Sequence, residues 1–401
     1  MSVKTFSKNI LDSGTVSLTA GTAHADFPLA RLYDRNISDI FKTSAAVTTE
    51  IHVDQAPNIN SNGGFETGDF TGWTQGSSAI STAEVNSGTY SAKLAIAAGY
   101  VEGPTTPKLN VDKTKTYTID AYFFIENYST GWASWEYWIY DAADAPLTSG
   151  ALITMNANMG WTLVTKTIGP SGSGADVIFP AGAAKILVKL KDGDAGATTL
   201  DIYIDEVSIY LADDIISIDS CIIAGGHNLY GETIDIQHSD NDIDWTNAIA
   251  QFTGDVGIMN KTLTGGAKKY WRIKITTPNI AVEITEIFLT PGYAWEADPS
   301  YPLESIEDQH NVKSITDRSG ENSYLKLGDQ KRIRKYNLRL MLEAQKTNLL
   351  ALWDDWGGYK PFYLLDHEAT LFFVELVGPL NLGGDLVGVY NADLLFREVL
   401  S

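Results

Sequence analysis

The chain has 401 residues, of which 29 are basic and 50 acidic, so its formal net charge at pH 7 is −21. This charge repels the phosphate backbone of nucleic acids and anionic membrane surfaces, and we expect neither as a partner. Hydrophobic residues make up 44% of the chain, which excludes wholesale disorder, and the length predicts about two to four domains.

Cysteine chemistry and membrane insertion are also excluded by the sequence. Cys221 is the only cysteine and lies in the apolar run IDSCIIAGG, so we expect a buried, inert thiol and neither an internal disulfide nor a thiolate metal cluster. No stretch of about 18 apolar residues occurs, and the first residues lack the apolar core of a signal peptide. We therefore expect a protein that is made and folded in a cytoplasm.

The composition favours β-structure throughout. Aromatic residues make up 11% of the chain and 35 residues are glycine. Most apolar runs are short and alternate with polar residues, as in strands between turns. The sequence therefore predicts a mainly β protein.

The first candidate strands lie in residues 14–55, within GTVSLTAG, FPLARLYDRN and TTEIHVDQ. The next segment, residues 58–211, contains a longer series of alternating runs with Gly, Asn, Asp or Pro between them. This spacing is typical of two packed antiparallel sheets. A sandwich is expected in the second segment, whereas the first has too few strands to close a core alone.

The two ends of the second segment carry a family resemblance. NGGFETGDFTGW, starting at Asn62, and LDIYIDEVSIY, starting at Leu200, resemble the signatures of jelly-roll carbohydrate-binding modules of the family 4/9/22 type. The resemblance covers about Asn58 to Leu211 and implies a β-sandwich that binds glycans.

The segments on either side of this sandwich resemble two halves of one fold. Residues 14–55 are similar to the first half of a discoidin-like (coagulation factor 5/8 C) sandwich. In residues 214–290, IQHSDNDIDW and YWRIKI are similar to strands of its second half. An insertion between Gln55 and about Asp214 explains both halves, because exposed loop tips tolerate inserted domains.

Beyond Pro291 the pattern changes. KRIRKYNLRLMLE alternates as a strand, and the apolar spacing of Leu349, Leu350, Leu352, Trp353 and Trp356, ended by Gly357 and Gly358, predicts the one helix. PFYLLD, TLFFVELVGPL and VYNADLLFREVL are expected to be strands. This order resembles the small α+β domains of phage tail and baseplate proteins.

The sequence thus predicts two β-sandwiches, one nested in the other, and a small C-terminal α+β domain. Residues 1–55 and 214–291 form the discoidin-like sandwich, residues 56–213 the inserted carbohydrate-binding-like domain, and residues 292–401 the tail-attachment-like domain.

Sugar binding needs aromatic rings beside carboxylate and amide groups. In WASWEYWIYD, side-chain alternation places Trp135, Tyr137 and Ile139 on one face and Glu136, Trp138 and Tyr140 on the other, without saying which face is core. We expect a glycan groove to be lined by Tyr122, Glu126, Trp132, Trp138 and Tyr140. The alternative is that these are ordinary core or surface aromatics; Trp73 and Trp161 are assigned to the core.

The family resemblance also implies a structural Ca²⁺. In such modules the ion is held by the Glu of the opening motif and the Asp of the closing strand, together with backbone carbonyls, which here points to Glu66 and Asp205. The alternative is that backbone N–H groups and water satisfy both carboxylates. Asp240, Asp242 and Asp244 do not make an EF-hand, because Trp245 and Gln251 stand where Gly and Glu are needed.

Catalysis has little support in the sequence. The six histidines are scattered, and neither HExxH nor GxSxG occurs. His227, in GGHNLYG, is expected to have a structural role in a turn. The basic cluster of Lys331, Arg332, Arg334 and Lys335 is expected to be a solvated edge or a contact with an acidic subunit.

The predicted function is that of a non-enzymatic structural component of a phage-type tail or baseplate, assembled in the host cytoplasm and located in the virion. Its expected partners are other tail subunits and a cell-surface polysaccharide, with many copies in a symmetric ring that adds avidity. The alternatives are a free-standing bacterial carbohydrate-binding protein and a polysaccharide depolymerase.

Overall fold

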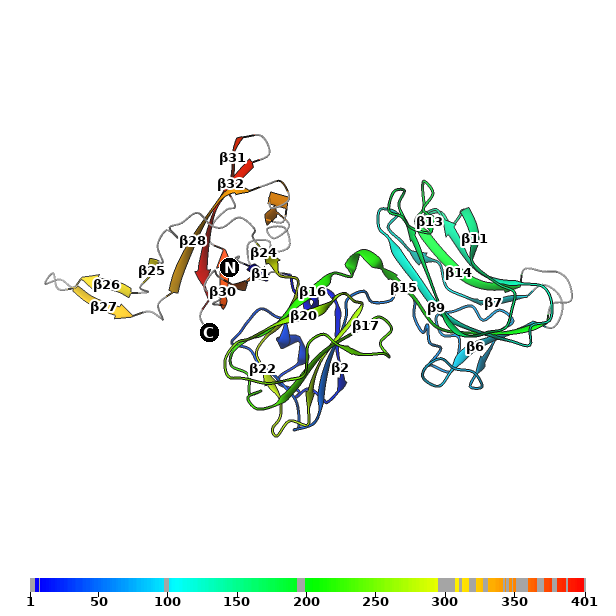
Figure 1. Ribbon diagram of the computed structural model, residues 1–401, viewed down its shortest axis with the longest axis horizontal. Coiled ribbons are helices and arrows are strands. Elements are labelled where there is room, and N and C mark those ends of the chain that lie inside the picture. The colour runs from blue at the N-terminus through cyan, green and yellow to red at the C-terminus, as the bar shows by residue number, and fades with distance from the viewer. Residues whose placement is uncertain are drawn as a thin grey trace. The chain divides into compact units, whose positions relative to one another are not determined.

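The computed structural model describes residues 4–6, 8–96, 101–192, 199–294, 307–309, 312–316, 322–326, 331–341, 343, 346–347, 349–350, 360–365, 371–376, 381–386 and 389–399. Over these residues the chain is mainly β, as predicted (Figure 1). Its contacts divide it into two compact units. One unit comprises residues Met1–Gln55 with Ile216–Ser401, and the other comprises Ala56–Ile215.

The unit at 56–215, here called the inserted sandwich, has two sheets. The first sheet is ordered β13-β12-β9-β15-β6-β5 and the second β11-β10-β14-β7, with β8 beside β14. Neighbouring strands are antiparallel except β12 and β13. The bounds are β5 (Ala79–Ser81), β6 (Ser91–Ile96), β7 (Glu102–Thr105), β8 (Leu109–Asn110), β9 (Tyr117–Glu126), β10 (Ala133–Tyr140), β11 (Pro146–Met155), β12 (Met159–Gly169), β13 (Val177–Ile178), β14 (Lys185–Asp192) and β15 (Leu200–Leu211), followed by the 3-10 turn η2 (Ala212–Asp214).

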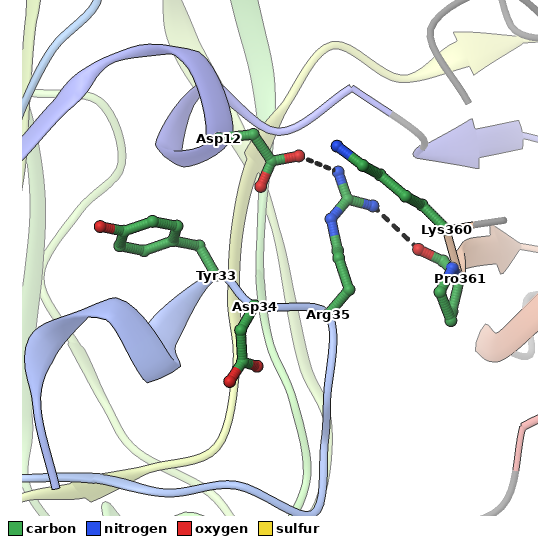
Figure 2. A pocket seen from close by; sticks show the side chains of 6 residues that line it. All are labelled: Asp12, Tyr33, Asp34, Arg35, Lys360 and Pro361. Carbon is green, nitrogen blue, oxygen red and sulfur yellow. Dashed lines mark hydrogen bonds and ion pairs between the residues drawn. The ribbon is translucent and has the colours of Figure 1, made fainter. Parts of the chain in front are cut away.

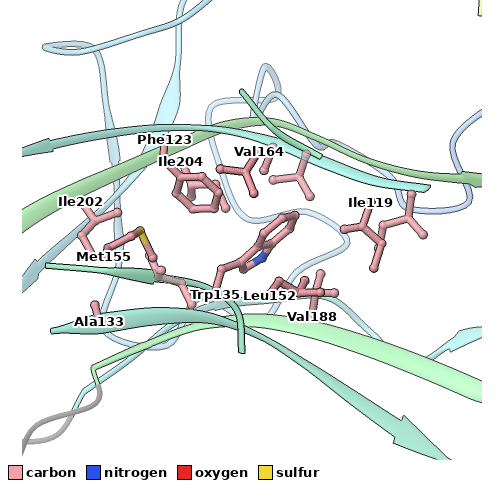
Figure 3. Close-up of a cluster of buried hydrophobic side chains, with 14 of the residues drawn as sticks. Ile119, Phe123, Ala133, Trp135, Leu152, Met155, Val164, Val188, Ile202 and Ile204 are labelled. Atoms are coloured by element: carbon pink, nitrogen blue, oxygen red, sulfur yellow. The ribbon is translucent and has the colours of Figure 1, made fainter. Parts of the chain in front are cut away.

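The core of the inserted sandwich lies between its two sheets (Figure 3). Phe123 on β9 and Trp135 on β10 face each other edge to face, with ring centroids 5.2 Å apart. Both side chains are at most 1% exposed. Alternation along β9 and β10 supplies every second side chain to this core, so the residues between them lie on the outer faces.

The sandwich formed by residues on both sides of the insertion is here called the flank sandwich. One sheet is ordered β18-β17-β21-β4-β2, with β19 beside β17; a second is ordered β20-β16-β23, and β22 pairs with β3. The bounds are α1 (Ile10–Ser13), β2 (Thr15–Ala20), η1 (Leu29–Leu32), β3 (Phe41–Lys42), β4 (Thr49–Asp54), β16 (Ser217–Ile223), β17 (Thr233–Ser239), β18 (Thr246–Asn247), β19 (Phe252–Thr253), β20 (Met259–Ala267), β21 (Tyr270–Thr276), β22 (Glu283–Ile284) and β23 (Ile287–Thr290).

Strands from before and after the insertion are neighbours in the flank sandwich. β4 pairs antiparallel with β21, placing Val53 opposite Trp271. Both of these side chains are buried in the same cluster as Ile218 on β16. Gln55, the last residue of the first segment, accepts from Ile216 N and donates to the Lys268 carbonyl, so hydrogen bonds join the points where the chain leaves and re-enters this sandwich.

The C-terminal sheet is ordered β24-β1-β29-β30-β32-β28-β25, with β31 beside β32, and β26 pairs with β27 in a separate hairpin. The bounds are β1 (Lys4–Phe6), β24 (Tyr293–Ala294), β25 (Glu307–Gln309), β26 (Val312–Thr316), β27 (Asn322–Lys326), β28 (Lys331–Met341), β29 (Phe362–Leu365), β30 (Leu371–Leu376), β31 (Asn381–Leu386) and β32 (Val389–Glu398).

Two predictions from the sequence concern the C-terminal sheet and the segment before β29. Residues 4–6, which we expected in the flank sandwich, pair instead with β29 and β24 of the C-terminal sheet. Of the predicted helix, Leu349 and Leu350 are helical. Leu352, Trp353, Trp356, Gly357 and Gly358 lie outside the described residues.

Arg35 links the flank sandwich to the strand β29 region. Its guanidinium pairs with the Asp12 carboxylate and donates to the Pro361 carbonyl at 2.9 Å (Figure 2). These groups line a cavity of about 340 Å³ that also contacts Lys360. The guanidinium carbon lies 4.5 Å from the ring centroid of Phe288, whose ring packs against Tyr363 of β29.

A buried carboxyl group lies next to Arg35. Glu286 is 0% exposed; its Oε2 accepts a hydrogen bond from Arg35 N, and among the described residues its Oε1 has no hydrogen-bond partner. Burial raises the pKa of Glu286 to about 9, despite the opposing effect of the Arg35 charge. Glu286 is therefore a neutral acid at pH 7.

Candidate functional site

The outer face of the sheet β11-β10-β14-β7 gathers aromatic, acidic and basic side chains of the inserted sandwich. On β10, Trp135 and Ile139 are at most 1% exposed and face the core. Glu136, Trp138 and Tyr140 point to the opposite side because side chains alternate along a strand. None of these three belongs to the hydrophobic core cluster, and all are half-buried.

Strand β14 adds a row of lysines to the same face. Its core-facing residues Ile186, Val188 and Leu190 are fully buried, so the alternate positions point outward. The antiparallel register places Lys185 opposite Tyr140 and Lys189 opposite Glu136. We call this surface the open face; it comprises Glu136, Trp138, Tyr140, Lys185, Lys189 and Lys191, with Lys108, Glu102 and Asp144 at its margins.

Two lysines cover the aromatic rings of the open face. The Lys189 ammonium nitrogen lies 4.8 Å from the ring centroid of Trp138. Lys108, just before β8, places its ammonium nitrogen 4.1 Å from the ring centroid of Tyr140. Both distances are in the range of cation–π contacts, in which the cation is attracted by the electron-rich ring face.

The Glu136 carboxylate fixes the Trp138 side chain in place. Its Oε2 accepts from Trp138 Nε1 at 3.2 Å, and its Oε1 accepts from Ser134 Oγ at 3.1 Å. The Lys191 ammonium lies 3.5 Å from the same Oε1. An indole ring held in this way loses little conformational freedom when a sugar stacks on it.

Lysines also neutralise the carboxylates at the margins. Lys189 pairs with Glu102 at 2.7 Å, and Asp144 receives Lys185 at 2.9 Å and Lys108 at 3.3 Å. The hydrogen bond from Lys185 lowers the pKa of Asp144.

The structure divides the predicted glycan-binding residues between two faces. Trp138 and Tyr140 lie on the open face, and Trp132, which is 39% exposed, directly precedes β10. Tyr122 and Glu126 lie on β9, on the outer face of the other sheet. Since the core separates the two outer faces, the five residues do not line a single groove.

Glu126 has a different neighbour from those expected. Glu126 accepts from the Tyr203 hydroxyl at 2.9 Å. On the same face Phe124 packs against Trp161, with ring centroids 5.7 Å apart. Trp161 is therefore outside the core to which we assigned it, whereas Trp73 does pack against the core.

Sequence reasoning missed the lysines and Glu136 as members of the site. The signal was present, because KILVKLKD has lysine at three of four alternate positions, and Ile186, Val188 and Leu190 between them are fully buried. The sequence did not say that β14 is the neighbour of β10, since this pairing joins residues about 50 positions apart.

Glu66 and Asp205, the two expected calcium ligands, both bind backbone N–H groups. The Glu66 carboxylate accepts from Thr89 N at 3.0 Å and Tyr90 N at 3.1 Å. Asp205, 0% exposed, accepts from Asn86 N at 3.0 Å and from Glu206 N at 2.8 Å. Burial is the main reason why the pKa of Asp205 is raised to about 7.

This geometry does not fit a calcium cage. Ca²⁺ needs six to eight oxygen ligands, whereas both oxygens of each carboxylate face N–H donors of residues 86–90 or Glu206. Among the described residues, no group of three or more His, Cys, Asp or Glu side chains is placed to hold a metal ion. The two carboxylates instead form a hydrogen-bonded staple between the opening motif, the turn at 86–90 and β15.

The other residues that the sequence singled out have structural partners. Asp242 pairs with His52 at 2.9 Å. His227 bonds the Gly257 carbonyl and accepts from Leu229 N. Cys221 is buried in the flank sandwich, and burial raises its pKa to about 12.

The side chains of Lys331, Arg332, Arg334 and Lys335 lie outside those described. In the described part of the chain, no helix is long and apolar enough to cross a membrane.

Comparison with known proteins finds structural similarity at low identity. No protein-family model matches the sequence, and no curated protein resembles it in sequence. The structure of TmCBM61 in complex with β-1,4-galactotriose is 15% identical, and the match covers 39% of this chain and 99% of that one with a TM-score of 0.28.

Two further structures are similar. The xylan-binding CBM22-1 domain of Paenibacillus barcinonensis Xyn10C is 16% identical over 39% of this chain and 95% of that one, with a TM-score of 0.27. The enzymatically active domain of bacteriophage CBA120 tailspike protein 4 is 13% identical over 38% of this chain, with a TM-score of 0.28; the match spans only 21% of the tailspike chain. The structural neighbours thus include carbohydrate-binding modules and part of a phage tailspike.

Proposed function

We propose that this chain is a non-enzymatic structural component of a phage-type tail or baseplate, and that it attaches to a cell-surface polysaccharide through the open face of the inserted sandwich. The flank sandwich, which we propose is discoidin-like, and the C-terminal sheet attach it to other tail subunits. The chain accordingly belongs in the virion.

The observation that carries the proposal is that Trp138 and Tyr140 lie on the same face, beside carboxylate and ammonium groups. Residues two apart on a strand lie about 7 Å apart, so two rings can contact neighbouring parts of a polysaccharide. The rings offer apolar faces to sugar C–H groups, and Glu136, Lys185 and Lys189 offer hydrogen bonds to hydroxyls.

The link between the flank sandwich and the C-terminal sheet supports a structural role. β1 at the N-terminus pairs with β29 near the C-terminus, and Arg35 connects Asp12 with Pro361. Both connections join distant parts of the chain and tie the flank sandwich to the C-terminal sheet. A ring of copies would add avidity to a weak single site.

The function is tested by affinity electrophoresis of the full chain through gels containing bacterial capsular and exopolysaccharides. Retardation by at least one polymer supports the proposal, and its loss in Trp138→Ala assigns binding to the open face. Solution viscosity of the same polymer separates binding from cleavage. An unchanged viscosity is expected; a progressive fall would identify a depolymerase instead.

A further inference from the structure

We infer that the open face selects an acidic polysaccharide, one whose sugars carry carboxylate or other anionic groups; this inference rests on the proposed glycan-binding function. The open face and its margins hold four ammonium groups: Lys108, Lys185, Lys189 and Lys191. Their distribution relative to the rings and the carboxylates determines what the face can accept.

The end of the open face near Tyr140 has an excess of positive charge. Asp144 is the shared carboxylate partner of both Lys108 and Lys185. One carboxylate cannot neutralise two ammonium groups, so this pair attracts a further anion. The side chains of Lys108 and Lys185 remain 34% and 23% exposed, which leaves them accessible to a ligand.

The lysines over the rings discriminate against neutral sugars. A sugar that stacks on the Tyr140 ring face covered by Lys108 must displace that ammonium, and one that stacks on the Trp138 ring face covered by Lys189 must displace Lys189. A neutral sugar gives the displaced ammonium no ionic partner in exchange. An acidic sugar supplies one at the edge of the ring, so the lost cation–π contact is replaced by a charge-assisted hydrogen bond.

The charge of the whole chain makes this face unusual. The chain carries 29 basic and 50 acidic residues, which repel an anionic polymer over most of the surface. The open face with its margins has four lysines to three carboxylates, Glu102, Glu136 and Asp144. An anionic polymer is thus attracted to this face in preference to the acidic surface elsewhere.

The experiment measures binding of the full chain to three polyuronates, polygalacturonate, alginate and hyaluronan, and to the carboxyl-reduced form of each. These pairs differ in charge and share the sugar backbone. We expect binding to at least one polyuronate, about three- to tenfold weaker binding to its reduced form, and weakening by added salt.

Variants locate the effect. The double variant Lys108→Gln with Lys185→Gln is expected to bind the polyuronate as weakly as the wild type binds the reduced form. Lys166→Gln is the matched control, because Lys166 pairs with Asp176 on the other sheet, at 3.7 Å, and should change nothing.

Three results would overturn the inference. Equal affinity for both forms, or binding of the neutral form alone, rejects acidic selection and leaves glycan binding intact. A polyuronate preference that survives in the double lysine variant rejects the assigned residues. Failure of the wild type to bind any of these polymers or those of the electrophoresis panel would reject the proposed function together with the inference.

Discussion

Trp138 and Trp161 are two half-buried indoles of the same sandwich, and they lie on opposite outer faces. Trp138 is held by Glu136 beside the lysines of β14, whereas Trp161 packs on Phe124 of β9. This difference provides a pair of substitutions in which ring size and burial class are the same, whereas the face and the neighbouring side chains differ.

Trp138→Ala is expected to weaken glycan binding by about 1 kcal/mol or more, because one stacked aromatic ring contributes on that order. Trp161→Ala should leave binding unchanged. Isothermal titration calorimetry of both variants, with circular dichroism to verify folding, checks the prediction. If Trp161→Ala weakens binding and Trp138→Ala does not, the ligand lies on the other face.

Glu286 predicts a pH dependence of stability. Because its folded pKa of about 9 lies above the ordinary value of 4.5, unfolding releases a proton between these values. The free energy of unfolding should therefore fall as the pH rises from 4.5 to about 9. Glu286→Gln, which mimics the neutral acid, should be more stable than the wild type at pH 8 by about 1–3 kcal/mol. Urea unfolding of both proteins at pH 5 and pH 8 measures this. If the variant and the wild type differ in free energy of unfolding by the same amount at both pH values, the prediction is contradicted.

At the scale of residues, the sequence predicted which side chains of β10 share a face but not which face is the core. Alternation placed Glu136, Trp138 and Tyr140 together, and the structure does so. It could not place Tyr122 relative to Trp138, because each strand alternates independently and the sheet to which a strand belongs depends on distant pairings.

The positions of the strands along the chain were predicted better than the pairing between strands. The short alternating runs gave the β class, and the strong apolar alternation of β14 was visible in KILVKLKD. By contrast, β1 has only three residues, too few for a periodic signal, so its position in the C-terminal sheet could not be predicted.

The hydrogen-bonded staple formed by Glu66 and Asp205 is expected to stabilise the inserted sandwich. Asp205→Ala removes the buried acceptor of part-buried N–H groups at Asn86, Ser87 and Glu206, and should destabilise the inserted sandwich by about 2–4 kcal/mol. Urea unfolding measures the loss. Asp176→Ala serves as the control. Asp176 is exposed and pairs with Lys166, so its loss should change the free energy of unfolding only slightly.

The same staple predicts no response to calcium. Because N–H groups rather than a cation satisfy the two carboxylates, the melting temperature should be unchanged by a chelator or by added Ca²⁺. A rise in melting temperature with Ca²⁺ that Asp205→Ala abolishes would show instead that the N–H groups move aside for the ion.

At the scale of the whole molecule, the division of contacts predicts independent folding. Residues 56–215, expressed alone, should unfold in one cooperative transition, since their core cluster is internal to the unit. Residues 1–55 joined to 216–401 by a short linker should also fold, because β4 and β21 pair directly. Calorimetry of both products checks this, and loss of cooperative unfolding in the second would contradict the nested layout.

The assignment of glycan binding to the open face is tested most directly by hydroxyl-radical footprinting of the full chain, with and without a bound polysaccharide. We expect the ligand to shield Trp138 and Tyr140 from oxidation while Tyr122 and Trp161 react as before. Shielding of Tyr122 and Trp161, with Trp138 and Tyr140 unprotected, would contradict it.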